Sequence, residues 1–472
     1  MTAGPRDETG AVRAVPPGPP RRATLRLLKQ LFTDRLALMG DSAEDYGDLV
    51  RIAIGPKTLY LVNHPDLAKH VLADNAANYH KGIGLREARQ ALGDGLLTSD
   101  GETWHRQRRT IQPAFQPKRI ARQAGLVASE AAGLVERLAA HEGPVDILQE
   151  MTGLTLGVLG KTLLDADLGG YGALGHSFEA VQDQAMFEAI TLGAVPRWAP
   201  LKKQVRFRAA RDELRRIADE LVDRRLANPV DGGEDVLSRL VGSETADGAS
   251  REGMRDELIT LLLAGHETTA STLGWAFHLV DEHPEVSARL HAEAVEVLGD
   301  RLPGYDDLRR LTYTTAVVEE VMRLYPPVWL LPRVAQADDE IGGYRVPAGS
   351  DVVVVPYTLH RHPGFWADPE RFDPGRFDPA GPGGRPLRYA YLPFGAGPRF
   401  CVGNSLGLLE AVFVLAMTAR DLELRKVPGR PVEPEAMLSL RVRGGLPMTV
   451  RPRPARERRA ARLIHSRRST RR

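Results

Sequence analysis

The chain has 472 residues, of which 43% are hydrophobic, 26% charged and 6% aromatic, a composition that excludes a disordered or fibrous protein and is sufficient for a large core. Its formal net charge of +2 gives no reason to expect nucleic acid as a partner. Cys401 is the single cysteine, so an internal disulfide is impossible and a reducing cytoplasm is the expected location.

The two ends of the chain differ in composition from the rest. Residues 1–22 are rich in Pro, Gly and Arg, and residues 451–472 contain ten Arg and one Glu. Both ends are expected to be disordered, because neither has enough apolar residues to offset the cost of ordering. For the basic C-terminal end, a contact with nucleic acid or with anionic lipid is the alternative interpretation. The N-terminal residues contain no apolar run of the length that a signal peptide or a transmembrane anchor needs. A single catalytic domain is therefore expected over residues 23–450.

The first part of that domain is predicted to be mainly helical. Residues 24–39 are amphipathic at helical spacing, which is typical of a helix packed on the body, although a helix bound to a membrane surface has the same pattern. Two alternating segments within 49–62 flank a Gly-Pro pair and predict a β-hairpin. The pattern over 64–330 is helical with short breaks, and the polar stretch 228–251 is expected to be an exposed loop.

Residues 254–282 are predicted to form one long helix. The run Leu258–Ala264 is apolar on every side, and it is much shorter than the roughly 20 residues that a membrane span needs, so a buried central helix is expected. Farther on, 341–357 predicts two strands and 360–400 a long Pro- and Gly-rich meander, with another helix after it. The expected fold class is mainly α with small β-sheets.

Cys401 lies in a glycine-rich loop that precedes this last helix. Gly395, Gly397 and Gly403 permit tight turns, so that backbone N–H groups can point at one sulfur atom. These donors and the positive end of the helix dipole stabilise a thiolate, and Arg399 adds a cation suited to a carboxylate. A lone cysteine is commonly a buried, inert thiol, but a thiolate beside a carboxylate-binding Arg is what a haem iron with its propionates requires.

The segment Phe394–Gly403 resembles the haem-binding signature F-x-x-G-x-R-x-C-x-G of the cytochrome P450 family, with all six fixed positions present. The resemblance implies the cytochrome P450 fold, in which the long buried central helix lies over the haem. It also implies haem b as the cofactor, with the Cys401 thiolate as the axial ligand of its iron and with Phe394 and Arg399 in contact with it.

Within the central helix, residues 264–269 combine a glycine, a carboxylate and two hydroxyls. One interpretation places the Thr side chains on the preceding helical turn and Glu267 in a salt bridge. In the other, Gly265 lets a flat cofactor approach the backbone, and a hydroxyl beside an acid suits stepwise proton delivery. The segment is similar to the oxygen-activation motif of the same family, which implies Thr268 as the alcohol and Glu267 as the acid.

Trp104 and Arg108 are four residues apart, which places both on one helix face. A core Trp beside surface arginines has the same spacing. The pair, however, matches the W-x-x-x-R motif of the family, and this resemblance implies that both side chains bind a haem propionate. Arg333, which follows a proline, resembles the family's further propionate ligand.

Glu320 and Arg323 form an E-x-x-R pattern, which on a helix surface is only a weak ion pair. Together with Arg371, in the PERF segment of the meander, the pattern resembles the buried Glu–Arg–Arg triad of the family. The resemblance implies a structural role, in which the network fixes the loop that carries Cys401.

The resemblance covers roughly 45–450 and implies a haem-thiolate monooxygenase, an oxidoreductase that inserts one oxygen atom from O2 into its substrate. Electrons would come from NAD(P)H through separate partners, a ferredoxin and a ferredoxin reductase, and such partners are usually acidic. Four arginines expected on the thiolate side would attract them, unless they are simply solvated: Arg106, Arg109, Arg385 and Arg388.

Two other functions are weighed against a monooxygenase. One is a haem-thiolate peroxygenase or isomerase that needs no electron partner, and the other is a haem-binding sensor without enzymatic activity. Relatives of the first kind commonly lose the acid–alcohol pair, and a sensor has no need of it. Glu267 and Thr268 are both present, which favours the monooxygenase.

Two apolar segments are expected to line the substrate pocket unless they are simply core, 261–264 and 328–331. Apolar walls favour a small, largely hydrocarbon substrate. A fatty acid would need a cation for its carboxylate, which Arg86 or Arg89 could supply, whereas a terpene needs none. A terpene-like product of secondary metabolism is therefore placed ahead of a fatty-acid substrate. Specific contacts are expected in two segments whose sequence carries no readable code, 78–100 and 180–200.

Overall fold

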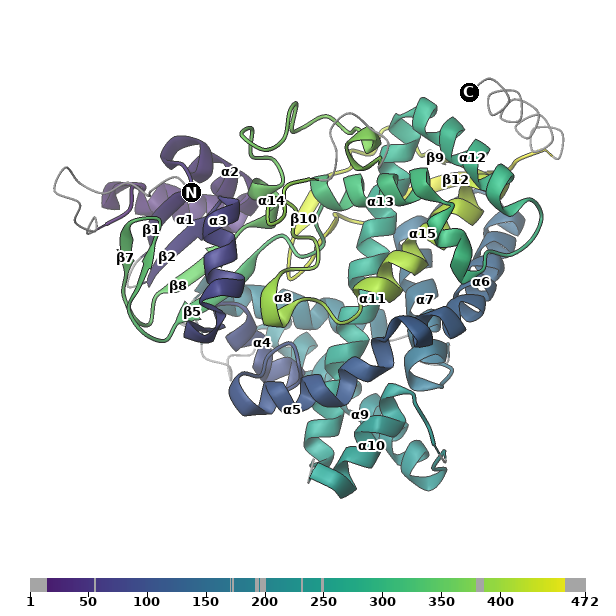
Figure 1. Ribbon diagram of the computed structural model, residues 1–472, viewed down its shortest axis with the longest axis horizontal. Helices are drawn as coiled ribbons and strands as arrows, with labels where there is room; N and C mark the ends of the chain where they lie inside the picture. Colours follow the sequence, from purple (N-terminus) through teal and green to yellow (C-terminus); the bar gives the residue numbers. More distant parts are fainter. Residues whose placement is uncertain are drawn as a thin grey trace.

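The computed structural model describes residues 15–54, 57–169, 171, 174–191, 195, 201–230, 232–247, 250–378 and 386–454. A five-stranded sheet with α1 and α2 lies at one end of the molecule, and the helical part lies at the other, around the long helix α11 (Figure 1). The chain is thus mainly helical, as the sequence predicts. Within the described residues, no helix is long and apolar enough to cross a bilayer.

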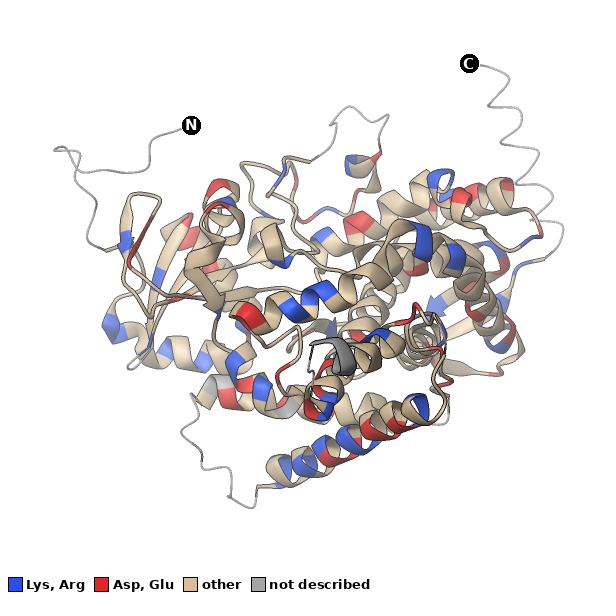
Figure 2. Cartoon of the chain, turned by 60° about the horizontal axis from the view of Figure 1, so that its bottom comes forward, with Lys and Arg blue, Asp and Glu red and all other residues tan. Residues whose placement is uncertain are grey.

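The α-helices are, in chain order, α1 (Thr24–Thr33), α2 (Arg35–Tyr46), α3 (Pro65–Lys69), α4 (Leu85–Leu92), α5 (Gly101–Ile111), α6 (Pro117–Ala140), α7 (Ile147–Leu159), α8 (Leu174–Thr191), α9 (Lys202–Ala227), α10 (Val236–Asp247), α11 (Arg251–Glu282), α12 (Pro284–Leu298), α13 (Thr312–Leu324), α14 (Pro356–Leu359) and α15 (Asn404–Asp421). The strands are β1 (Leu49–Ile54), β2 (Lys57–Val62), β3 (Tyr79–Lys81), β4 (Pro144–Asp146), β5 (Leu331–Ala335), β6 (Asp339–Ile341), β7 (Tyr344–Val346), β8 (Asp351–Val354), β9 (Leu422–Lys426), β10 (Pro434–Ala436), β11 (Leu440–Val442) and β12 (Pro447–Pro452). Along α9, acidic and basic residues are interspersed from Arg211 to Arg225 (Figure 2).

The large sheet has the strand order β1-β2-β8-β5-β3, in which only β2 and β8 run parallel. Its side chains alternate between two apolar layers, because successive residues of a strand point to opposite faces. Tyr60 and Val62 of β2 pack into one layer, and Leu61 packs into the other. The predicted hairpin over 49–62 is confirmed. The two strands predicted over 341–357 are β7 and β8, but they pair with other strands and not with each other.

α11 forms the centre of the helical part. The Ser250 side chain caps its first turn by accepting a hydrogen bond from the Gly253 N–H at 3.1 Å. Leu258 and Leu262 are fully buried, and α7, α9, α13 and α15 pack around the helix. An apolar surface on all sides of a helix is stable only when neighbours cover every side. The prediction of a buried central helix is therefore confirmed.

Several predicted loops contain regular structure. The stretch 228–251 includes α10, and 78–100 includes β3 and α4. In the part of α10 whose side chains are described, Val236, Leu237 and Leu240 are buried, and the polar residues around them give the stretch the composition of a loop. At the N-terminus the Pro17 carbonyl accepts a hydrogen bond from β1 at 2.8 Å, and β12 extends past the predicted domain boundary at 450. The remaining terminal residues, 1–14 and 455–472, lie outside the described residues.

The meander after α14 closes around a buried ion pair on α13. Arg323 donates two hydrogen bonds to the carboxylate of Glu320, at 2.7 and 2.8 Å, and both side chains are fully buried. The second arginine of this network is Arg376, whose Nε lies 3.4 Å from Glu320 Oε1. The assignment of Arg371 from sequence is wrong: its side chain is exposed, and only its carbonyl takes part, accepting from Arg323 at 3.0 Å.

Arg376→Ala should therefore destabilise the protein more than Arg371→Ala. Loss of Arg376 leaves a buried carboxylate with one cation fewer, which typically costs about 1–3 kcal/mol, whereas an exposed side chain typically changes the free energy of unfolding by about 0.5 kcal/mol or less. Denaturant unfolding of the two variants beside the wild type measures the difference. Equal losses for both variants would contradict the assignment of Arg376.

Candidate active site

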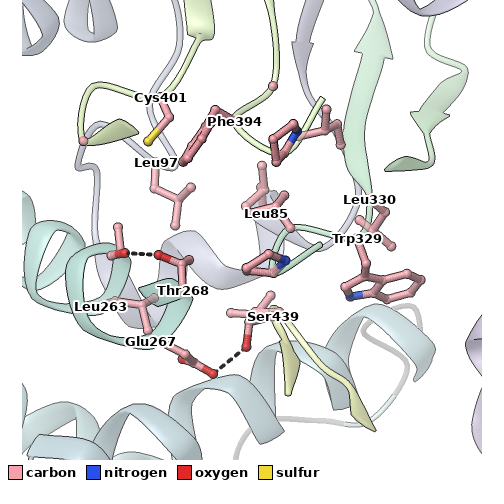
Figure 3. A pocket seen from close by; sticks show the side chains of 18 of the residues that line it. Leu85, Leu97, Leu263, Glu267, Thr268, Trp329, Leu330, Phe394, Cys401 and Ser439 are labelled. Atoms are coloured by element: carbon pink, nitrogen blue, oxygen red, sulfur yellow. Dashed lines mark hydrogen bonds between the residues drawn. The ribbon is translucent and has the colours of Figure 1, made fainter. Parts of the chain in front are cut away.

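A cavity of about 510 Å³ lies between the large sheet, α11 and the loop that precedes α15, with walls that are mostly apolar. Cys401 lies on one side of this cavity, and Leu263, Glu267 and Thr268 of α11 lie on the opposite side (Figure 3). Two sequence motifs that are far apart in the chain are thus brought together across one space.

The loop around Cys401 is held in a conformation that depends on its glycines. The Cys401 N–H donates to the carbonyl of Phe394 at 3.0 Å. Gly397 has a φ of 68°, and a Cβ at this position would lie 1.9 Å from the carbonyl oxygen of Leu72, so no other residue fits. Gly403 is the N-cap of α15, which places Cys401 at the positive end of that helix, as predicted.

Several groups surround the sulfur of Cys401. Burial raises the pKa of its thiol, while the backbone N–H groups of Gly403 and Asn404 and the cation of Arg108 act in the opposite direction. Arg108 also donates to the carbonyl of Phe400 at 2.8 Å, which links α5 to the loop. Donors and a cation around one sulfur suit a thiolate ligand, and a bound metal ion deprotonates such a thiol outright.

His360, which the sequence analysis did not single out, connects the Cys401 loop to the buried ion pair on α13. The Leu392 N–H donates to His360 Nε2 at 2.8 Å, and His360 Nδ1 lies 3.3 Å from the carbonyl oxygen of Arg323. Burial lowers the pKa of His360 to about 3, so its ring is neutral and Nδ1 carries the proton. The ring therefore links α13 to the segment that leads into the Cys401 loop and fixes their relative position.

The predicted propionate-binding residues gather at one end of the cavity. Trp104 and Arg108 of α5, Arg333 of β5 and Arg399 all line it. Arg399 forms an ion pair with Asp100 through Nη2, and its guanidinium lies 5.5 Å from the centre of the Trp104 ring. The other terminal nitrogen of Arg399, Nη1, is buried and has no hydrogen-bond partner among the described residues.

Lys81 adds a cation to this end of the cavity that the sequence analysis missed. It pairs with Arg333 in the β3–β5 register, and its Nζ donates to the carbonyl of Leu96 at 2.5 Å. Burial, followed by repulsion from Arg399, lowers the pKa of Lys81 to about 7 and that of Arg333 to about 10. A lysine on the inward side of an alternating strand is the signal that could have revealed it. Asp100 offsets only part of the positive charge of this cluster.

The acid and the alcohol of α11 are each bonded to other groups. Thr268 Oγ1 donates to the carbonyl of Ala264 at 2.9 Å, which is the back-bond to the preceding turn. Glu267 accepts from Ser439 Oγ at 2.6 Å (Figure 3) and from Gln182 Nε2 of α8. Two neutral donors thus hold Glu267, where a salt bridge was the alternative expectation. Neither donor was identified from the sequence, because both lie far from Glu267 in the chain.

Gly265 lines the cavity and also lies against α7. A Cβ at this position would lie 2.2 Å from Leu159 Cδ1 of α7. The missing side chain therefore permits close packing of α11 on α7, and the approach of a flat cofactor to the backbone of Gly265 stays a prediction.

Comparison with known proteins identifies the family. The cytochrome P450 family matches residues 16–448. Cyclooctatin synthase of Streptomyces melanosporofaciens is 39% identical over 414 residues, which cover 86% of this chain and 89% of the relative. Cyclooctat-9-en-7-ol 5-monooxygenase of the same organism is 38% identical with the same coverage. Pentalenene oxygenase of Streptomyces avermitilis is 33% identical over 407 residues, covering 84% of this chain and 89% of the relative.

The chain belongs to the cytochrome P450 family, and its fold, mainly helical with small sheets, agrees with that family. It is a monooxygenase and an oxidoreductase, in line with its relatives. Membership implies a haem iron with a thiolate ligand and O2 as a substrate. The residues at the cavity fit that group: the partly uncompensated cations and the buried Nη1 of Arg399 suit its propionates, and the donors around Cys401 suit a thiolate.

Lys81→Met should weaken the pH dependence of haem binding. The pKa of Lys81 is lowered to about 7 by burial, and a propionate carboxylate beside it would raise that pKa again, so binding above pH 7 takes up a proton. The affinity of the wild type for haemin should then fall between pH 7 and pH 9, by about tenfold more than that of the variant. Haemin titrations of the two apoproteins, followed by Soret absorption, measure both slopes, with Lys57→Met as a control at another part of the cavity wall. Identical slopes for wild type and Lys81→Met would contradict the prediction.

Proposed function

We propose that the chain binds haem b through the Cys401 thiolate and inserts one oxygen atom from O2 into a small, apolar, terpene-like substrate. The observation that carries this proposal is the position of Cys401 across one cavity from Glu267 and Thr268 (Figure 3). When bound, the haem iron with its thiolate ligand supplies the activation of O2 and the cleavage of its O–O bond.

Two sets of residues would hold the cofactor. The Cys401 loop would supply the thiolate ligand, and Phe394 of the same loop lines the cavity beside it (Figure 3). At the cationic end of the cavity, charge-assisted hydrogen bonds would hold the propionates and neutralise the cations. The residues that we assign to the propionates are Lys81, Trp104, Arg108, Arg333 and Arg399.

Glu267 and Thr268 would deliver protons. Thr268 lines the cavity, and its hydroxyl would donate a proton there once it leaves the carbonyl of Ala264. The carboxyl group of Glu267, one residue earlier, would replace that proton. Because Glu267 is bonded to Ser439 and Gln182, its carboxylate must leave one of these donors before it can reach Thr268. Ser439 and Gln182 would therefore act as positioning residues for the acid.

Thr268→Ala should divert electrons away from product. A positioned proton donor typically contributes about 10²–10⁴-fold to the step that it serves, so the variant should consume NAD(P)H while releasing mainly peroxide or water. Product formed per NAD(P)H consumed is the measurement. Thr315→Ala is the matched control, because Thr315 on α13 makes the same back-bond to the preceding turn, to Leu311 at 2.8 Å, away from the cavity. Wild-type coupling in Thr268→Ala would refute the role.

We further propose that electrons reach the haem from NAD(P)H through a ferredoxin and its reductase. Arg106 and Arg109 lie exposed on α5, the helix that carries Trp104 and Arg108 to the cavity, and Arg388 is exposed near the Cys401 loop. Among the described residues none of these three exposed arginines forms an ion pair, so they are available to an acidic partner. Arg385, the fourth predicted arginine, lies outside the described residues.

The terpene-like substrate is supported by the wall of the cavity and by the relatives. Of the two predicted segments, Leu261, Leu263 and Ala264 of α11 line it, and so do residues 328–331. The prediction is wrong for Leu262, which is fully buried in the core. Two of the relatives carry the names of cyclooctatin and pentalenene. From the predicted contact segments, 78–100 supplies Ile83, Leu85, Leu96 and Leu97, and 180–200 supplies Ala185 and Met186.

A fatty-acid hydroxylase is the second candidate, because one cation on the cavity wall lies outside the set that we assign to the propionates and could hold a carboxylate. That cation is Lys57 of β2. The arginines suggested by the sequence are engaged elsewhere: Arg86 forms an ion pair with Asp351 at 3.0 Å, and Arg89 is paired with Asp94. Neither arginine lines the cavity, which favours the terpene.

A titration with sesqui- and diterpenes beside a series of fatty acids should give a Soret spin shift with terpenes at lower concentrations. Hydrocarbon contacts at the wall contribute to both ligands, but a fatty acid must also bury its carboxylate. Tight fatty-acid binding that weakens in Lys57→Met, together with no response to terpenes, would reverse the ranking. The double variant Arg86→Ala and Arg89→Ala is the control, since its arginines lie off the cavity wall.

A further inference from the structure

The N-terminal helix α1 exposes an apolar edge. The side of the helix that contains Leu27 packs on the sheet, where Leu27 is 5% exposed. Leu25 and Phe32, in contrast, are 81% and 54% exposed, and Leu28 lies half-buried between them. Residues at spacings of three and seven share one side of a helix. The apolar arc of α1 is therefore wider than the part that the body of the protein covers.

The charges on α1 and on the residues before it have one sign. Residues 15–33 contain four basic residues and no acidic residue. The neighbouring acidic groups belong to α2 and its N-cap: Asp34 accepts from the Ala37 N–H, and Asp41 accepts from Gln30 Nε2 of α1 at 2.9 Å. The basic side chains are exposed and form no ion pair with any described residue: Arg21, Arg22, Arg26 and Lys29. On α9, by comparison, acidic and basic residues are interspersed (Figure 2), and Arg216 and Arg224 pair with Glu213 and Glu220. We call Leu25, Leu28 and Phe32, together with these four cations, the basic–apolar face.

The same helix also forms part of the cavity wall. Leu31 of α1 and Leu38 and Met39 of the following helix α2 line the cavity. α1 therefore presents the basic–apolar face outward and contributes to the cavity inward. A ligand that leaves an apolar surface in contact with α1 would begin its path close to the cavity wall.

We propose that the basic–apolar face binds the surface of an anionic lipid bilayer. A helix with an apolar edge flanked by cations inserts that edge at the level of the lipid headgroups, while its cations contact anionic phosphates. That this contact supplies apolar substrate to the cavity rests on the proposed function, whereas the binding itself does not. A second copy of the chain is a poor occupant, because two such faces would place like charges against each other.

The test is flotation of the full-length, haem-loaded protein with phosphatidylcholine vesicles that contain or lack phosphatidylglycerol. The wild type should float with the anionic vesicles and remain free with the neutral ones. Arg26→Gln with Lys29→Gln should weaken binding by about 25-fold, since one basic residue near an anionic surface contributes roughly fivefold. Leu25→Ser with Phe32→Ser should weaken it by at least about tenfold, including at high salt, because loss of buried apolar area is not screened.

The matched control is Leu126→Ser with Leu302→Ser, which removes two leucines that are 44% and 47% exposed elsewhere on the molecule; it should bind as the wild type does.

Absence of wild-type binding to anionic vesicles would overturn the proposal. Wild-type binding by both α1 double variants would also overturn it, because another part of the chain would then hold the lipid. A dimer in solution that dissociates in Leu25→Ser with Phe32→Ser would assign the face to a second copy instead. None of these measurements uses a substrate, so failure of the proposed function would leave them unchanged.

Discussion

The buried ion pair between Glu320 and Arg323 is the constraint on which the position of Cys401 depends. A buried charge pair is stable only when the remaining hydrogen bonds of both groups are satisfied. Arg323 meets this condition by donating to three carbonyl groups of the meander, those of His360, Pro369 and Arg371, which closes the meander around α13. The neutral ring of His360 then bonds the segment that leads into the Cys401 loop. Cys401 is thus positioned by side chains that do not contact it.

A second constraint is the separation of charge within the cavity. Lys81, Arg333 and Arg399 are gathered at one end, where burial and repulsion from Arg399 lower the pKa of both Lys81 and Arg333, and leucines cover much of the remaining wall. Cations that repel one another at close range favour an anionic ligand between them. A cofactor with two carboxylates would bind at the cationic end and leave the apolar wall free for a substrate. Its binding also stabilises the fold, because the folded state alone offers this cluster.

The sequence was most informative where neighbouring residues act together. The loop of Cys401, the α11 segment around Thr268 and the pair on α5 were all predicted, because the chemistry of each depends on short spacings. Prediction failed where the partner lies far along the chain. The meander contains two segments of the form P-x-R-F, ending at Phe372 and Phe377, and only the three-dimensional structure shows that Arg376 of the second one reaches Glu320. Lys81, Gln182 and Ser439 carry no local motif, so their positions in the site could not be read from the sequence.

The hydrogen bonds of Glu267 depend on the position of two segments that line the cavity. Its two donors come from separate segments: Gln182 belongs to α8, which also lines the cavity, and Ser439 is itself part of the wall. A substrate that fills the cavity presses on both segments. Hydrogen bonds weaken steeply with distance and misalignment, so a small displacement of either segment changes how firmly the carboxylate is held. A substrate that fits poorly would leave Glu267 on its donors and the hydroxyl of Thr268 on its own helix, where neither can pass a proton into the cavity.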